Sequence, residues 1–314
     1  MDGLTVGVHV AAATAGKTVE GIVAAEEAGI DAVWMTSGGV APDPFAVLAA
    51  AAMKTERIKF GTSIVPTFPR HPLVMAQGAI AVDQLAPGRL RLGVGPSHKP
   101  TMEGMFGMEF ERPLQHLREY LAILRALLQE GKVDFKGQRL EAHAQLAAPT
   151  GVTVMASALR TNGFRLCGEV AEGAISWVCP LPYLRDVAVP AINEGAAKAG
   201  REAPPLVAHV PVVVSEDAEA VREAARRQIG FYPRVPFYSQ MFVDAGFPEA
   251  AEGQMSDRII DALVVHGSAD AVKERLREVS TYGAGELLAM PIQPPDDPDA
   301  WARTVAALGE LARE

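Results

Sequence analysis

The chain has 314 residues, of which 49% are hydrophobic, so it can bury a large core. Its 29 basic and 38 acidic residues give a net charge of -9, which argues against a surface for nucleic acid or an anionic membrane. Two cysteines are too few for a disulfide framework, and we recognise no signal peptide and no transmembrane run, so we expect a cytoplasmic protein.

Strand-like and helix-like segments alternate along most of the chain. The strand-like runs are short and apolar, and most end in turn-forming or small residues. We expect strands over residues 4–10, 31–36, 58–65, 89–95, 152–157, 173–179, 206–214 and 286–292. We expect helices over residues 18–28, 44–54, 71–85, 113–128, 161–170, 184–199, 217–229 and 299–313. Thr18 is the expected N-cap of the first helix, and Ser215 or Asp217 caps the helix that begins near residue 217.

Eight β/α units in one chain predict a (β/α)8 TIM barrel that occupies residues 1–314 as a single domain. The competing interpretation is a doubly wound open sheet. Residues 132–146 resemble a small hairpin. Residues 230–284 are longer than an ordinary crossover and form an insertion after strand seven, with many aromatic residues and a further helix over residues 270–282.

The carboxyl ends of the strands form the working face of such a barrel, and here they carry few charges. We find no Gly-x-Ser-x-Gly motif, no His-Glu-x-x-His motif and no cluster of carboxylates, and the seven histidines lack metal-ligand spacing. The sequence therefore predicts no metal site. An apolar, weakly charged barrel mouth suits a flat organic cofactor that supplies its own reactivity to a small-molecule substrate.

His98 is the sharpest single candidate for chemistry, because it follows a glycine turn at the end of the fourth strand. It can act as a cofactor contact or a proton donor, since histidine alone titrates near neutral pH without help. The alternative is a loop histidine that caps a backbone carbonyl.

The turn after the fifth strand is a candidate phosphate site. Ala156, Ser157 and Ala158 precede a helix that begins near Thr161, and helix N-termini bind phosphate through their N–H groups. Arg160 lies in the same turn. The alternative is an ordinary capped helix with exposed arginines.

Aromatic side chains are candidates for a substrate pocket. Trp177 lies near the end of the sixth strand, His9 ends the first, and Phe231 and Tyr232 open the insertion. The same residues are equally compatible with an ordinary hydrophobic core.

Several segments resemble the bacterial luciferase-like oxidoreductase superfamily, in particular its members that depend on the deazaflavin coenzyme F420. The resemblance covers most of the chain. Its most specific parts are residues 27–34, 57–63, 70–89 and 93–95. The segment 95–99, followed by residues 103–107 and 112–113, is similar to a subgroup of F420-dependent reductases. The resemblance implies a (β/α)8 barrel with an insertion after strand seven, and it implies a homodimer.

The resemblance also implies a cofactor site. A non-prolyl cis peptide in the third-strand bulge, here Ser63–Ile64, would back the deazaflavin ring, and the turn after the fifth strand would hold its phosphate. The residues that match cofactor positions are Ser37, Gly38, Ser63, Ile64, Val65, Gly95, Ser97, His98, Thr101, Ala156, Ser157, Ala158, Leu159 and Arg160.

The chain departs from the family pattern at the residues that oxidise alcohols. Ser37 and Gly38 stand where sugar-phosphate dehydrogenases of the family carry an Asp-His pair, and His98 replaces an acidic residue. These departures favour reduction, with hydride moving from reduced F420 to an unsaturated organic substrate such as an enone or imine. The alternatives are an FMN-dependent luciferase-like monooxygenase and a non-catalytic flavin-binding protein.

Overall fold

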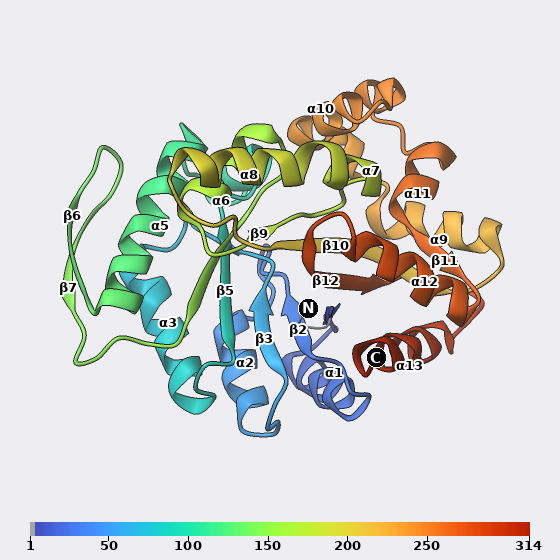
Figure 1. Ribbon diagram of the computed structural model, residues 1–314, viewed down its shortest axis with the longest axis horizontal. Coiled ribbons are helices and arrows are strands. Elements are labelled where there is room, and N and C mark those ends of the chain that lie inside the picture. The colour runs from blue at the N-terminus through green and yellow to red at the C-terminus, as the bar shows by residue number, and fades with distance from the viewer. Residues whose placement is uncertain (1–3) are drawn as a thin grey trace.

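A computed structural model describes residues 4–314 and contains a closed barrel of eight parallel strands (Figure 1). Neighbouring strands pair in parallel all the way round, and β10 closes the ring by pairing with both β9 and β12. The barrel strands are β1 (Thr5–His9), β2 (Ala32–Met35), β3 (Lys59–Thr62), β5 (Leu90–Gly95), β8 (Thr153–Ser157), β9 (Ala174–Ile175), β10 (Leu206–Val214) and β12 (Ala284–Pro291). The predicted (β/α)8 fold is confirmed, and the open sheet is excluded.

Helices surround this barrel. The main ones are α1 (Ala15–Glu27), α2 (Pro44–Ala52), α3 (Pro72–Leu85), α5 (Pro113–Glu130), α6 (Thr161–Val170), α8 (Val189–Lys198), α9 (Ala218–Ile229) and α13 (Ala300–Ala312). Three short pieces add to them: α4 (Lys99–Gly104), α7 (Leu181–Tyr183) and a π-helical turn over Leu184–Ala188. The strands β6 (Lys132–Lys136) and β7 (Glu141–Gln145) form the predicted antiparallel hairpin. No helix among residues 4–314 is long and apolar enough to cross a membrane.

The start of α1 corrects one prediction. The N-cap is Thr14, whose hydroxyl accepts a hydrogen bond from the backbone N–H of Lys17, and Thr18 lies buried inside the helix. Thr18 was misassigned because the small residues before it carry no apolar period to mark the first turn. The other predicted cap, Asp217, is confirmed.

Two predicted strands are shorter than their apolar runs. The third run breaks after Thr62 and resumes as β4 (Val65–Pro66), with a cis peptide bond between Ser63 and Ile64, as predicted. The sixth strand stops at Ile175 instead of Cys179. Val178 has a φ of 50°, a left-handed conformation that a strand cannot contain, so the chain turns across the barrel end.

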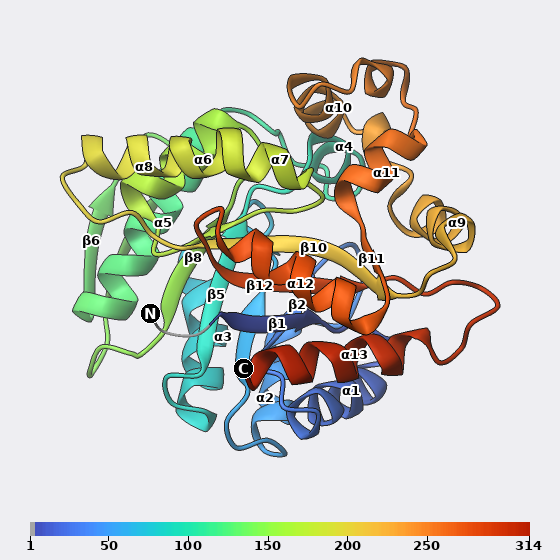
Figure 2. The same ribbon diagram turned by 45° about the vertical axis from the view of Figure 1, so that its right-hand side comes forward.

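The insertion between β10 and β12 forms a compact group of helices. It contains the 3-10 turn η2 (Tyr232–Arg234), α10 (Pro236–Asp244), the 3-10 turn η3 (Pro248–Glu252), α11 (Asp257–Leu263), β11 (Val265–Gly267) and α12 (Ala269–Ser280). β11 extends the sheet by pairing with β10. Figure 2 shows α10 beside α4, near the end of the barrel at which the parallel strands finish.

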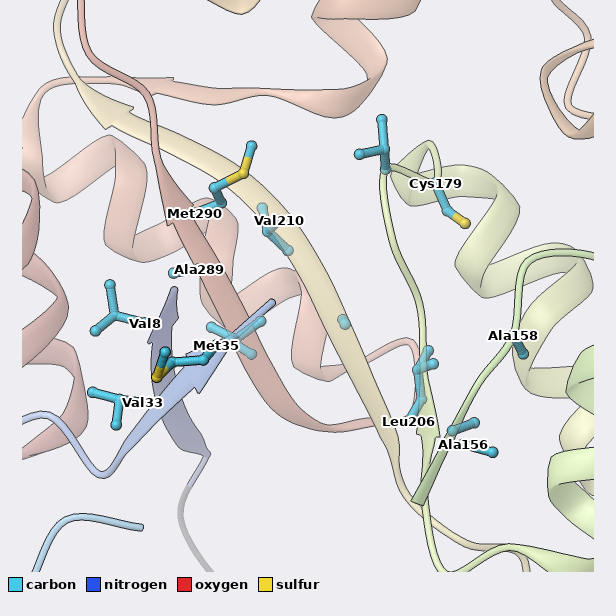
Figure 3. Packing of buried hydrophobic residues seen from close by; sticks show 14 of the residues in the cluster. Val8, Val33, Met35, Ala156, Ala158, Cys179, Leu206, Val210, Ala289 and Met290 are labelled. Atoms are coloured by element: carbon cyan, nitrogen blue, oxygen red, sulfur yellow. The ribbon is translucent and has the colours of Figure 1, made fainter. Parts of the chain in front are cut away.

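The barrel interior contains a bulky aromatic side chain and an ion pair. The Trp34 indole fits because Gly61 faces it: a Cβ at Gly61 would lie 2.3 Å from the Trp34 ring. The indole N–H donates to the Glu286 carboxylate at 2.8 Å, and Arg91 pairs with the same carboxylate. Outside the barrel wall, buried side chains such as Val8, Val33 and Ala289 come from adjacent strands (Figure 3).

Candidate active site at the barrel mouth

The floor of the barrel mouth is formed by Ile64 and Trp177. Both side chains are partly buried and pack on one interior cluster, which consists of Trp34, Met155, Ile175, Val207 and Leu288. Two residues predicted for different roles, one behind the cofactor ring and one in the substrate pocket, therefore lie over the same interior layer.

The end of the third strand joins the end of the second. The backbone N–H of Ser63 donates to the Met35 carbonyl at 2.7 Å, and the N–H of Ser37 donates to the Ile64 carbonyl at 3.2 Å. The Ser63 hydroxyl is buried and has no hydrogen-bond partner among residues 4–314. A Cβ on Gly38 would meet no other atom within 4 Å, so there is open space above the second strand.

The end of the fourth barrel strand, β5, approaches the fifth closely. A Cβ at Gly95 would lie 2.1 Å from the Ser157 hydroxyl, so any larger residue at Gly95 would displace the Ser157 side chain. Ser97 then takes a φ of 62°, and His98 becomes the N-cap residue of α4, which contains Thr101.

The imidazole of His98 does not cap α4, and its ring meets the edge of Tyr238 on α10 with centroids 5.4 Å apart. Burial lowers the pKa of His98 below its usual value. The side chain is therefore mainly neutral at pH 7, which weakens its role as a proton donor and suits a hydrogen-bonding or shaping role.

The turn after β8 leads directly into α6, with Arg160 at the N-cap position. Arg160 provides no side-chain cap for the helix, and the Gly163 N–H donates to its carbonyl at 2.8 Å, which leaves the N–H groups of Thr161 and Asn162 without an intrahelical partner. Its guanidinium pairs with Asp244 of α10 at 3.1 Å. The insertion thus contacts the predicted phosphate turn as well as His98.

A chain of aromatic rings crosses the mouth. The Trp177 ring lies 5.6 Å from that of His9, centroid to centroid, and its indole N–H donates to the Tyr232 hydroxyl at 2.5 Å. Tyr232 in turn packs against Tyr238 with centroids 4.5 Å apart. Phe231 stacks on Tyr232 at 4.2 Å and is 51% exposed. The four predicted substrate-pocket residues are therefore connected to one another.

Sequence reasoning missed His209. It is fully buried beneath Trp177, with ring centroids 3.9 Å apart, and its Nδ1 accepts the N–H of Val178 at 3.1 Å. Its Nε2 atom has no partner among the described residues. Strand alternation could have found it, because His209 lies two positions beyond the interior residue Val207.

The buried histidines of the mouth and three of its strand-end segments carry no charge at neutral pH. Burial lowers the pKa of His9 to about 4 and that of His209 well below its usual value, so both imidazoles are neutral at pH 7. The segments that follow β1, β2 and β9, residues 10–14, 36–42 and 176–183, contain no Asp, Glu, Lys or Arg. Within residues 4–314, no group of three or more His, Cys, Asp and Glu side chains could hold a metal ion.

Comparison with known proteins assigns the chain to a protein family. The model of the luciferase-like monooxygenase family matches residues 3–286. The chain belongs to this family. The resemblance inferred from the sequence is thereby confirmed.

Among its relatives, the F420-dependent glucose-6-phosphate dehydrogenase of Nocardia farcinica is 33% identical over 296 residues, which cover 87% of each chain. Two solved structures share the fold over 98% or more of both chains. An F420-dependent secondary alcohol dehydrogenase in complex with an F420-acetone adduct has a TM-score of 0.82 at 19% identity, covering 98% of each chain. The oxygenating constituent of 3,6-diketocamphane monooxygenase from Pseudomonas putida, in complex with FMN, has a TM-score of 0.75 at 20% identity, covering 99% of this chain and 98% of the other.

Proposed function

We propose that this protein is an F420-dependent oxidoreductase that reduces an unsaturated organic substrate at the barrel mouth. The observation that carries the proposal is the convergence of Ser37, Ile64, His98 and the uncapped N-terminus of α6 at one end of the barrel. The similarity to an F420-dependent relative supports the choice of cofactor.

The residues at the mouth fit a deazaflavin. Ile64 offers an apolar surface for a flat ring, the buried Ser63 hydroxyl has hydrogen-bonding capacity to spare, and Gly38 borders open space. The uncapped first turn of α6 would bind the phosphate through its N–H groups. The residues that would hold the cofactor are Ser37, Gly38, Ser63, Ile64, Val65, Gly95, Ser97, His98, Thr101, Ala156, Ser157, Ala158, Leu159 and Arg160.

When bound in its reduced form, F420 supplies a hydride, which is a proton with two electrons. The protein's task is to place the electrophilic carbon of the substrate beside that donor and to exclude water. A proton must reach the neighbouring atom of the substrate so that the double bond is reduced. The hydroxyl of Tyr232 is a neutral donor near the mouth that can relay it from solvent.

The chemistry of the mouth favours reduction over alcohol oxidation. Alcohol oxidation needs a base, but Ser37 and Gly38 cannot accept a proton at neutral pH, and a histidine with a pKa of about 4, such as His9, is a weak base. Reduction of an unsaturated bond adds a proton to the substrate instead of removing one, so it needs no such base.

Anaerobic turnover tests the proposal. Reduced F420 should be oxidised in the presence of the protein and an enone acceptor, with one acceptor double bond reduced for each F420 oxidised. Turnover with reduced FMN and oxygen in place of F420 would instead identify a monooxygenase. A protein that binds F420 yet oxidises none with a panel of enones and imines would contradict the proposed reaction.

A further inference from the structure

Large apolar side chains are exposed around the barrel mouth. Val40 follows the second strand and is 99% exposed, Met105 and Phe106 follow α4, Phe231 precedes η2, and Phe237 lies in the first turn of α10. Single exposed apolar residues are ordinary on a protein surface, whereas a group of them around a site points to a ligand.

Contacts made by neighbouring residues bring together the segments that carry these side chains, which we call the rim. A Cβ on Gly39, next to Val40, would lie 3.7 Å from the end of the Met105 side chain. Helix α4 then runs back to His98, whose ring meets Tyr238 of α10, the neighbour of Phe237. Figure 2 shows the same proximity of α4 and α10.

Two of the three cations that border this rim lie beside carboxylates. Lys99 is near Glu103 at 3.7 Å, and Arg160 pairs with Asp244. The Cγ atom of Arg234 on η2 would lie 3.2 Å from a Cβ on Gly253, and its guanidinium has no carboxylate partner among the described residues. Lys99 and Arg160 therefore offer an anionic substrate no unpaired cation, and Arg234 is the remaining positive charge of this group.

One polar group on the rim is placed to recognise a substrate. The Tyr232 hydroxyl accepts the Trp177 indole N–H, so its own proton remains for donation. A substrate carbonyl oxygen is a neutral acceptor of the matching kind.

Resting on the proposed function, we propose that the substrate is a neutral, largely apolar carbonyl compound, held between the α4 side of the rim and Phe231 and Phe237, with its carbonyl oxygen hydrogen-bonded to the Tyr232 hydroxyl. Phosphorylated sugars and carboxylate-bearing acceptors are then poor substrates, because their charge would lose water against an apolar rim on which Lys99 and Arg160 already lie beside carboxylates.

Binding of the neutral apolar dye Nile red tests the rim without any turnover. The protein should enhance its fluorescence, and the double variant Phe231→Ser/Phe237→Ser should weaken its binding about 10-fold, since each ring contributes apolar contact. The matched control is Met53→Ser, which removes a side chain that is 71% exposed at the end of α2. Equal dye binding by the wild type and the double variant would overturn the proposal.

A matched pair of acceptors tests the substrate class. With reduced F420, benzalacetone should have a kcat/KM at least about 10-fold above that of its para-carboxylate analogue, and glucose 6-phosphate should not compete. Tyr232→Phe should lower kcat/KM for benzalacetone while F420 affinity stays within about threefold, because only the donor to the substrate is lost. Preference for the carboxylate would overturn this inference and leave the F420 assignment standing. Failure to bind F420, with dye binding intact, would overturn the proposed function instead.

Discussion

The polar side chains buried at the two ends of the barrel interior differ in charge. Toward the amino-terminal ends of the strands, the buried side chains of Arg91 and Glu286 form an ion pair, and Arg91 stacks over Trp34 with its Cζ 4.6 Å from the ring centroid. The Nε and Nη2 atoms of Arg91 have no hydrogen-bond partner among the described residues. At the mouth, His9 and His209 are neutral, and Ser63 and His209 keep polar atoms without partners among the described residues.

The difference separates stability from ligand binding. The lower end is level with Thr5 and Thr153, the first residues of their strands, and its two charges are paired with each other. The mouth holds buried polar atoms whose hydrogen bonds are still to be made, which is the condition under which a ligand gains affinity. We therefore expect mutations at the lower end to change stability and mutations at the mouth to change binding.

The largest effect should come from breaking the lower ion pair. Arg91→Met leaves the Glu286 carboxylate buried without its cation, and such a loss typically costs about 3–5 kcal/mol. The double variant Arg91→Met/Glu286→Leu should recover most of that loss in urea unfolding. A single variant as stable as the wild type would show that the pair does not hold this end of the barrel.

The buried histidines of the mouth should make stability depend on pH. The folded-state pKa of His209 lies below its unfolded value, so both states are neutral above pH 6.5, and only the unfolded state takes up a proton as the pH falls. The free energy of unfolding should decrease by about 1.4 kcal/mol per pH unit for each such histidine below about pH 6.

His209→Asn isolates that contribution, because the amide oxygen can still accept the Val178 N–H. Its unfolding free energy should fall less steeply between pH 6 and pH 5 than that of the wild type. Identical slopes would mean that His209 is protonated in the folded state.

His98→Gln distinguishes shaping of the cofactor site from proton donation. We expect F420 affinity to fall about 10-fold, because the imidazole shapes the cofactor site. The rate of the saturated enzyme should change less than about threefold, because the lowered pKa of His98 leaves it a poor proton donor. The control is His143→Gln on the exposed β6–β7 hairpin. A rate loss of about 10²-fold or more at unchanged affinity would assign His98 as the general acid.

The smallest effect should come from Asp244→Asn, which releases Arg160 from its partner in α10. The freed guanidinium should tighten F420 binding by about two- to fivefold, the range expected of an exposed ion pair. Asp261→Asn, which removes the partner of Arg222 away from the mouth, is the matched control. Weaker binding in Asp244→Asn would mean that the ion pair itself organises the phosphate turn.

Local pattern was enough to predict the barrel, because each strand and helix has its own apolar period, and the turn at His98 follows directly from Gly93 and Gly95. The early end of β9 was not predictable, since it depends on the left-handed conformation of Val178, a β-branched residue. The pairing of Arg160 with Asp244 and the position of His209 beneath Trp177 join residues far apart in sequence. The first contact exists only once the insertion has packed on the barrel, and the second only once the barrel has closed between β9 and β10.

Calorimetric titration with F420 and with FMN tests the central claim most directly. We predict that F420 binds with a Kd of about 1 µM or tighter and that FMN binds at least about 10-fold more weakly, a difference of about 1.4 kcal/mol. FMN binding as tight as F420 binding, or tighter, would contradict the assignment of the barrel mouth to a deazaflavin.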